Sequence, residues 1–113
     1  MNQPTTEPYH ITKNQQNNIA MGIARYYDIK SITFLTSERN RIAGSIHVIV
    51  EINNDPNLEN DIPYLELDRL DNPNLQNTLV PLNEYAYLEH TPTIPADSPV
   101  DMSHIKVTYL KQE

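Results

Sequence analysis

Oxygen-bearing side chains recur at regular intervals between Asp55 and Glu66. With Asp55 as position 1, a carboxylate or an amide stands at positions 1, 3, 5, 7 and 12 of a twelve-residue window. The five residues are Asp55, Asn57, Glu59, Asp61 and Glu66. Calcium takes its ligands mainly from carboxylate and amide oxygens that one loop brings together. The spacing therefore predicts calcium as the cofactor of this segment.

The residues within and before this window favour a different interpretation. The window resembles the calcium loop of an EF-hand, but Asn60 stands where that loop has glycine, and Pro63 occupies the ninth position. Residues 45–53 alternate like a strand, whereas a helix precedes the loop of an EF-hand. The alternative is an acidic loop with no cofactor, and both interpretations stay open.

Other candidates for catalysis or metal binding lack the required spacing. The four histidines lie in separate segments and form no zinc-binding pair. No serine stands in the G-x-S-x-G elbow of a hydrolase. Glu51, Glu66 and Asp68 could pair across strands as an acid and a base, but carboxylates on a small antiparallel sheet usually belong to its solvated face. We therefore expect no enzyme.

Tyrosine dominates the aromatic residues, with seven tyrosines against one phenylalanine and no tryptophan. Tyr64, Tyr85, Tyr87 and Tyr109 lie on or near predicted strands. Tyrosine is enriched at protein interfaces, because its ring is apolar and its hydroxyl is polar. The four side chains therefore predict an interface with a protein partner, and their alternative role is half-buried cover for a thin core.

Composition excludes several classes of function. The 113 residues carry a net charge of −7, which opposes binding to nucleic acid or to an anionic membrane. The absence of cysteine excludes disulfides, thiolate metal sites and thiol nucleophiles. Two glycines are too few for a phosphate-binding glycine-rich loop. No apolar run approaches the roughly 20 residues of a membrane-spanning helix, so we expect no direct membrane insertion by this chain.

Hydrophobic periodicity predicts the elements of the first half. Apolar residues at helical spacing predict a helix over 13–27, with Thr12 as its N-cap and Gln15 completing a capping box. The period then changes to two, which predicts strands over 30–37 and 42–53. A polar turn at 38–41 joins them, so we expect an antiparallel hairpin.

Proline and asparagine interrupt the second half. Residues 62–68 form a candidate third strand, and residues 79–89 fit either a short helix or a strand. Residues 91–103 contain three prolines and predict a long surface loop. Alternation over 105–110 predicts a final strand, paired with the long strand at 42–53. As an exposed edge, this strand could form a homodimer by extending the sheet.

These elements define one domain of the α+β class. We expect an N-terminal helix packed on a three- to four-stranded antiparallel sheet, with a long Pro/Asn-rich loop region. Residues 1–12 have two prolines and no apolar period, so they predict a flexible tether before a single domain at 13–113. Met1 is either the native start of a cytosolic protein or a start that follows a removed signal or lipid-anchor segment.

Three short phrases carry a resemblance to a known family. They are YYDIKSITF at 26–34, GSIH at 44–47 and INND at 52–55. Over residues 17–55 the chain resembles DUF1433, a family of uncharacterised small proteins of low-GC Gram-positive bacteria. Many members look like precursors with an N-terminal membrane or lipoprotein segment. The resemblance implies an extracellular domain that is membrane-anchored in its precursor, and it supplies no catalytic residue.

Three functions follow as hypotheses. The first is an extracytoplasmic lipoprotein domain that acts by contact with an unknown protein partner and has no catalytic activity. The second is a cytosolic accessory or mobile-element protein with the same fold. The third is a calcium-binding module that uses the loop at 55–66.

Overall fold

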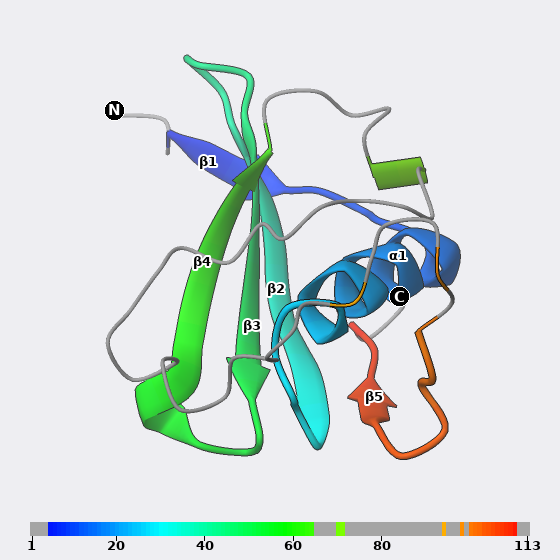
Figure 1. The fold of residues 1–113 in the computed structure, drawn as a ribbon. Coiled ribbons are helices and arrows are strands. Elements are labelled where there is room, and N and C mark those ends of the chain that lie inside the picture. The colour runs from blue at the N-terminus through cyan, green and yellow to red at the C-terminus, as the bar shows by residue number, and fades with distance from the viewer. Residues whose placement is uncertain (1–4, 65–69, 72–93, 95–97, 99, 111–113) are drawn as a thin grey trace.

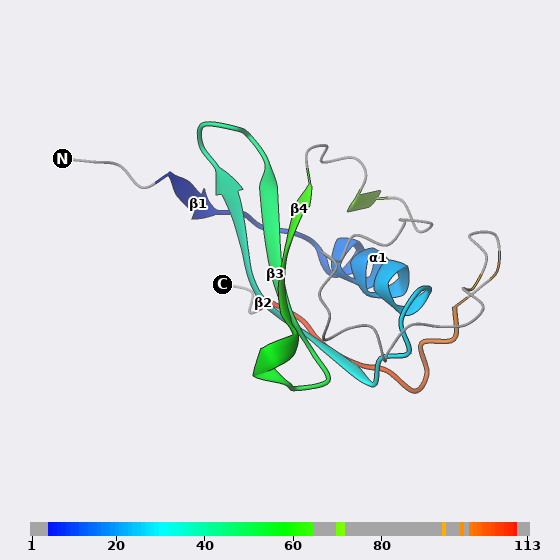
Figure 2. The same ribbon diagram turned by 60° about the vertical axis from the view of Figure 1, so that its left-hand side comes forward.

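Among the residues that the structure describes, one α-helix packs on a twisted sheet of five strands (Figure 1). This computed structural model describes residues 5–64, 70, 71, 94, 98 and 100–110. The elements in chain order are β1 (Thr6–Pro8), α1 (Lys13–Ala24), β2 (Ser31–Asn40), β3 (Ile46–Ile52), the 3-10 helix η1 (Pro56–Leu58), β4 (Glu59–Tyr64) and β5 (Lys106–Thr108). Figure 2 shows α1 against one side of the sheet. The α+β prediction of a helix packed on an antiparallel sheet is therefore confirmed.

The helix α1 begins at the predicted capping box. The Thr12 hydroxyl accepts a hydrogen bond from the backbone N–H of Gln15 at 3.0 Å, and the Gln15 side chain accepts one from the N–H of Thr12 at 2.9 Å. The helix ends at Ala24, three residues before the predicted end. The N–H groups of Tyr26 and Tyr27 both turn back to the carbonyl of Ile23, which tightens the chain and stops the helix.

The strands β2 and β3 form the predicted antiparallel hairpin. Phe34 lies opposite Val50, and alternate residues of β3 are buried under α1. The strand β2 extends through residues 38–40 of the predicted turn at 38–41 and ends at Asn40, and the chain reverses at residues 41–45. The cause is Asn40, whose side-chain oxygen accepts hydrogen bonds from the N–H groups of Ile42 and Ala43. Gly44 completes the turn with a φ of +77°.

Alternate residues of β4 complete the core on the same face of the sheet. The strand starts at Glu59, three residues before its predicted start, and it pairs with β3 from Glu51 to Ile46. Pro63 lies within this strand, where it has no N–H to donate to a further strand. The remainder of the predicted strand, 65–68, lies outside the described residues, as do 79–89.

Residues 5–12 of the segment predicted to be a tether belong to the fold. Thr6 to Pro8 pair with β2, and the N–H of Tyr9 donates to the carbonyl of Ser37 at 2.9 Å. Ile11 is 1% exposed. The prediction was wrong for these residues because a strand of three residues that includes a proline shows no measurable period.

The predicted final strand has a different partner from the expected one. The strand β5 runs parallel to β2, from Ser31 opposite Lys106 to Thr33 opposite Thr108. It does not pair with β3, because β2 and β4 already flank that strand on both sides.

Before β5, the Ser103 hydroxyl and N–H both donate to the Asp101 carboxylate, and these bonds hold the pKa of Asp101 below its ordinary value.

Gln16, on the first turns of α1, connects three segments of the chain. Its side chain is fully buried, and its amide nitrogen donates to the carbonyls of Ile11 and Thr12 at 3.2 and 3.3 Å. Its amide oxygen accepts a hydrogen bond from the N–H of Leu110 at 2.8 Å. One side chain therefore holds the segment after β1 and the segment after β5 against the same helix.

We predict that Gln16→Ala lowers the free energy of unfolding by about 2–3 kcal/mol, because it takes this partner from the buried carbonyl of Ile11 and from the half-buried N–H of Leu110. Urea unfolding followed by circular dichroism measures this loss. Asn14→Ala is the matched control, because Asn14 is exposed on the same helix and should change stability by less than about 0.5 kcal/mol. Equal effects of the two substitutions would contradict the role of Gln16.

Candidate functional site

A groove crosses the edge of the sheet beside β2. The strands β1 and β5 both pair with β2 on the side away from β3, β1 at residues 38–40 and β5 at residues 31–33. Within the described ranges, residues 34–36 have no strand partner on that side. The resulting groove has a volume of about 840 Å³. Residues 33–37 form its floor, and residues 8–11 and 108–110 form its two walls.

A bulge in β2 brings Leu35 into the groove. The register with β3 shifts between Phe34 and Thr36, which leaves Leu35 as the extra residue. Its side chain is 44% exposed and lines the groove. An aliphatic side chain with that exposure is a ready contact for an apolar group, so the bulge gives the groove an apolar floor.

Hydrogen bonds to α1 hold the wall at 108–110 in place. The hydroxyl of Tyr109 donates to the side-chain oxygen of Asn17 at 2.5 Å, and the Lys13 ammonium lies 5.3 Å from the centre of the Tyr109 ring. Leu110 is held through Gln16. This wall is therefore rigid before any ligand arrives.

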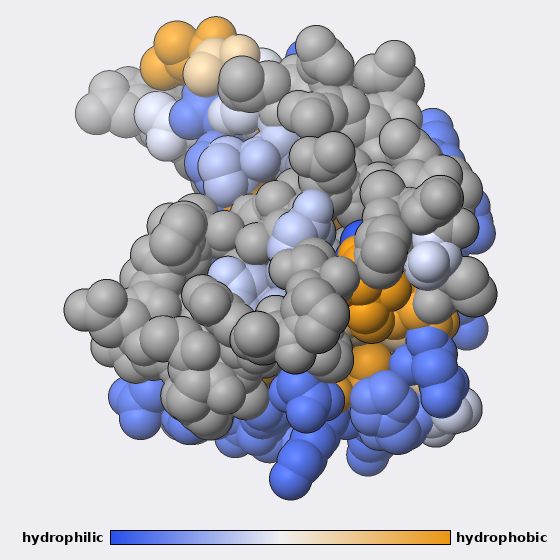
Figure 3. Space-filling model, viewed as in Figure 1, coloured by the Kyte–Doolittle hydropathy of each residue, from blue (hydrophilic) through white to orange (hydrophobic). Residues whose placement is uncertain are grey.

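Tyr109 separates the groove from a second hollow between α1 and β5. This hollow has a volume of about 570 Å³, and Met21, Met102 and Ile105 contribute apolar lining. Figure 3 shows the apolar surface gathered between α1 and β5. Tyr109 lines both spaces, so its ring contributes to the groove and to the packing of β5.

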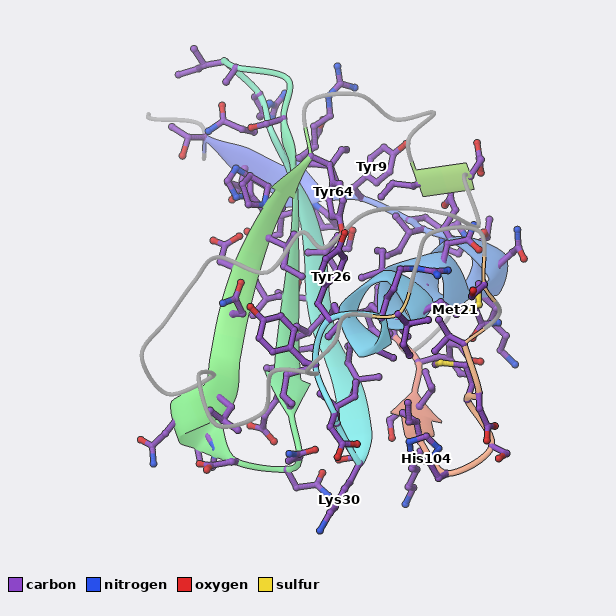
Figure 4. All side chains as sticks on the ribbon, in the orientation of Figure 1. Tyr9, Met21, Tyr26, Lys30, Tyr64 and His104 are labelled. Carbon is purple, nitrogen blue, oxygen red and sulfur yellow. The ribbon has the colours of Figure 1, made fainter. Side chains whose placement is uncertain are left out.

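The predicted interface tyrosines separate into three groups. Tyr64 is 3% exposed, and in Figure 4 it lies on the side of the sheet that carries α1. Its predicted role at an interface was therefore wrong, because the alternation of β4 turns it into the core. Tyr109 is half-buried and lines the groove, together with Tyr9, which the sequence analysis did not select. Tyr85 and Tyr87 lie outside the described residues.

The predicted calcium ligands do not form a loop of EF-hand shape. Asp55 caps η1, where its carboxylate accepts a hydrogen bond from the N–H of Asn57 at 2.9 Å. Glu59 and Asp61 lie on the extended strand β4, and Glu66 lies outside the described residues. No group of three or more potential metal ligands occurs within the described part of the chain. Calcium binding itself stays a prediction.

A hydrogen-bonded chain of Ser45, His47 and Asp61 lies at the hairpin end of the sheet. The Ser45 hydroxyl is 3.2 Å from Nε2 of His47, and Nδ1 of His47 is 2.9 Å from the Asp61 carboxylate. Sequence spacing gave no sign of this group, because the pairing of β3 with β4 brings Asp61 to His47. The order of the three residues is that of a serine hydrolase triad.

Acyl transfer needs an accessible serine and a buried aspartate, and these residues have the reverse exposure. Ser45 is 6% exposed, whereas the Asp61 side chain is 57% exposed. The N–H groups of Ile42, Ala43 and Gly44 in the neighbouring turn all donate to Asn40, so they cannot stabilise an oxyanion. The chain of hydrogen bonds therefore fixes the orientation of His47 between two strands.

Comparison of the chain with protein-family models, with curated proteins and with solved structures gives no match. The resemblance to the DUF1433 family therefore stays a prediction. Within the described residues, no helix has the length and apolar character needed to cross a membrane.

We predict that Ser45→Ala leaves the hydrolysis of p-nitrophenyl acetate unchanged, because the hydroxyl is buried and the N–H groups of the neighbouring turn already donate to Asn40. The measurement compares initial rates for the native protein, Ser45→Ala and Asp61→Asn. A loss of rate in both variants, with folding intact by circular dichroism, would instead show that the three residues act as a catalytic unit.

Proposed function

We propose that this chain is a protein-binding domain without catalytic activity, and that its binding site is the groove beside β2. The observation that carries the proposal is the open stretch at residues 34–36 between β1 and β5. Aromatic and aliphatic side chains line the groove at this stretch: Tyr9, Leu35, Tyr109 and Leu110. Such side chains are the usual anchors of protein contacts.

The size of the groove favours a short segment of a partner protein. Three residues of a strand span roughly 10 Å, so the open edge is too short for a full additional strand. A volume of about 840 Å³ nevertheless falls within the range of sites that enclose a ligand. The fitting ligand is a tight turn or a short extended segment that presents one apolar side chain to Leu35.

The polar groups of the groove suit a peptide rather than a hydrocarbon. Thr33 and Thr36 line the floor beside Leu35, and Thr108 lines one wall. Hydroxyls can donate and accept hydrogen bonds, as the backbone of a bound peptide requires. Because α1 already fixes the wall at 108–110, little conformational freedom is lost on that side when a peptide binds.

The location we propose for this domain is outside the cytoplasm, with a lipid anchor in the precursor. The support is the resemblance at residues 26–34, 44–47 and 52–55 to a family whose members often carry such a segment. A location in the cytosol as an accessory or mobile-element protein is the alternative.

We predict that peptides selected from a random phage-displayed library bind the native protein and lose affinity by about tenfold or more for Leu35→Glu, because a charge would replace the apolar floor. Fluorescence polarisation of labelled peptides measures the affinities. Asn57→Glu is the matched control, because it adds the same charge at an exposed position of η1. Equal losses for both variants, or none for either, would contradict the groove as the binding site.

We also predict that cells that produce the protein hold it in the membrane fraction, with a lipid-modified N-terminus. Intact mass measurement after separation of membrane and cytosol tests this location. An unmodified cytosolic chain that begins at Met1 would favour the cytosolic alternative, and it would leave the binding groove unaffected.

A further inference from the structure

The hairpin between β2 and β3 ends in an exposed isoleucine. Ile42 is 84% exposed, and the described part of the chain has one other exposed large hydrophobic residue, Leu35 in the groove. The hairpin projects beyond the sheet in Figure 1, and Figure 3 shows its end as an isolated apolar patch. A large apolar side chain at the end of a projection is suited to insertion into a partner.

Hydrogen bonds hold the tip in one shape. The Asn40 side chain accepts hydrogen bonds from the N–H groups of Ile42 and Ala43 at 2.9 and 2.8 Å, and the Asn40 carbonyl accepts one from Gly44 at 2.8 Å. The N–H of Arg41 donates to the carbonyl of Thr5 at 2.7 Å. The isoleucine is therefore held outward by the turn, and a partner would meet a preorganised surface.

The charge at the tip is opposite to that of the rest of the molecule. Arg39 and Arg41 are exposed beside Ile42, and neither takes part in an ion pair within the described residues. Glu38 follows Ser37 of the groove floor and pairs with Pro8 of β1, so a glutamate stands at that end of the groove. The net charge of the chain is −7.

We propose that the groove of one copy of this chain receives the β2–β3 hairpin tip of a second copy. This inference rests on the proposed function, because it uses the same groove. Ile42 would contact Leu35 and the aromatic walls, and Arg39 and Arg41 would lie near Glu38 of the other copy. Both complementary surfaces belong to one sequence, which favours a second copy over an unrelated partner.

A membrane is a poorer match for this tip. One apolar side chain and two arginines give little binding to a lipid surface, and an anionic surface would repel the acidic remainder of the chain. A second copy instead supplies an apolar groove with the Glu38 carboxylate at one end. Because the tip and the groove are different surfaces, the contact is heterologous and leaves an unused tip on one copy and an unused groove on the other in a simple dimer.

Sedimentation equilibrium over a wide range of protein concentration tests the proposal. We expect the native protein to self-associate, and Ile42→Asp and Leu35→Glu each to weaken association by about tenfold or more. Asn57→Asp is the control, because it adds a negative charge at an exposed position outside both surfaces. Thermal unfolding of each variant checks that the fold is retained, as expected for substitutions at exposed positions.

A mixing experiment identifies the two surfaces directly. Ile42→Asp retains an intact groove, and Leu35→Glu retains an intact tip, so an equimolar mixture should form heterodimers although neither variant associates alone. Two copies of Ile42→Asp both lack the apolar tip, so they should not associate with each other. Fluorescent labels on the two variants, read by energy transfer, would detect the mixed pair.

Three outcomes would overturn the proposal. They are a native protein that stays monomeric at all concentrations, a mixture that shows no energy transfer, and self-association that survives Ile42→Asp. If selected peptides still bind the groove of a monomeric native protein, the proposed function stands and only the second copy is excluded. If Leu35→Glu weakens neither the binding of peptides nor self-association, both proposals fail.

Discussion

The buried amide of Gln16 is the interaction on which the edge of the sheet depends. It is fully enclosed, and it bonds to backbone groups of residues 11, 12 and 110. A buried amide is costly unless its donors and acceptor are satisfied, so the three segments must meet at one point of α1. The segments after β1 and after β5 are also the walls of the groove. Core stability and the shape of the candidate site therefore rest on the same side chain.

The strand β2 serves the core with one face and the candidate site with one edge. Ile32 and Phe34 are buried under α1, whereas the bulge at Leu35 interrupts the register with β3. Two short strands cover the ends of the outer edge, and no strand among the described residues pairs with its middle on that side. Uncovered edges favour unwanted pairing between sheets. Here the open part is too short for a full strand, which restricts the edge to small segments.

Local signals predicted the elements that local interactions form. The capping box at Thr12 and the alternation of β3 are patterns within a few residues, and both are present in the structure. The groove could not be predicted, because segments near residues 9, 35 and 109 meet only through pairings that no period encodes. Gln16 stands in a run of polar residues and would be assigned to a solvated face. Its burial follows from the segments that cross over α1, and sequence periodicity does not contain that information.

The parallel pairing of β5 with β2 has a consequence for the order in which the molecule forms. Ser31 pairs with Lys106, 75 positions later, whereas the β2–β3 hairpin closes within a few residues. Long-range pairings close slowly, because more chain entropy is lost before any contact compensates for it. During synthesis the helix and the hairpin can therefore form well before the second wall of the groove exists. The hairpin tip is exposed from the start, and the surface proposed to receive it is completed only when residues 106–110 emerge. Two nascent chains that both lack residues 106–110 would therefore be unable to capture one another.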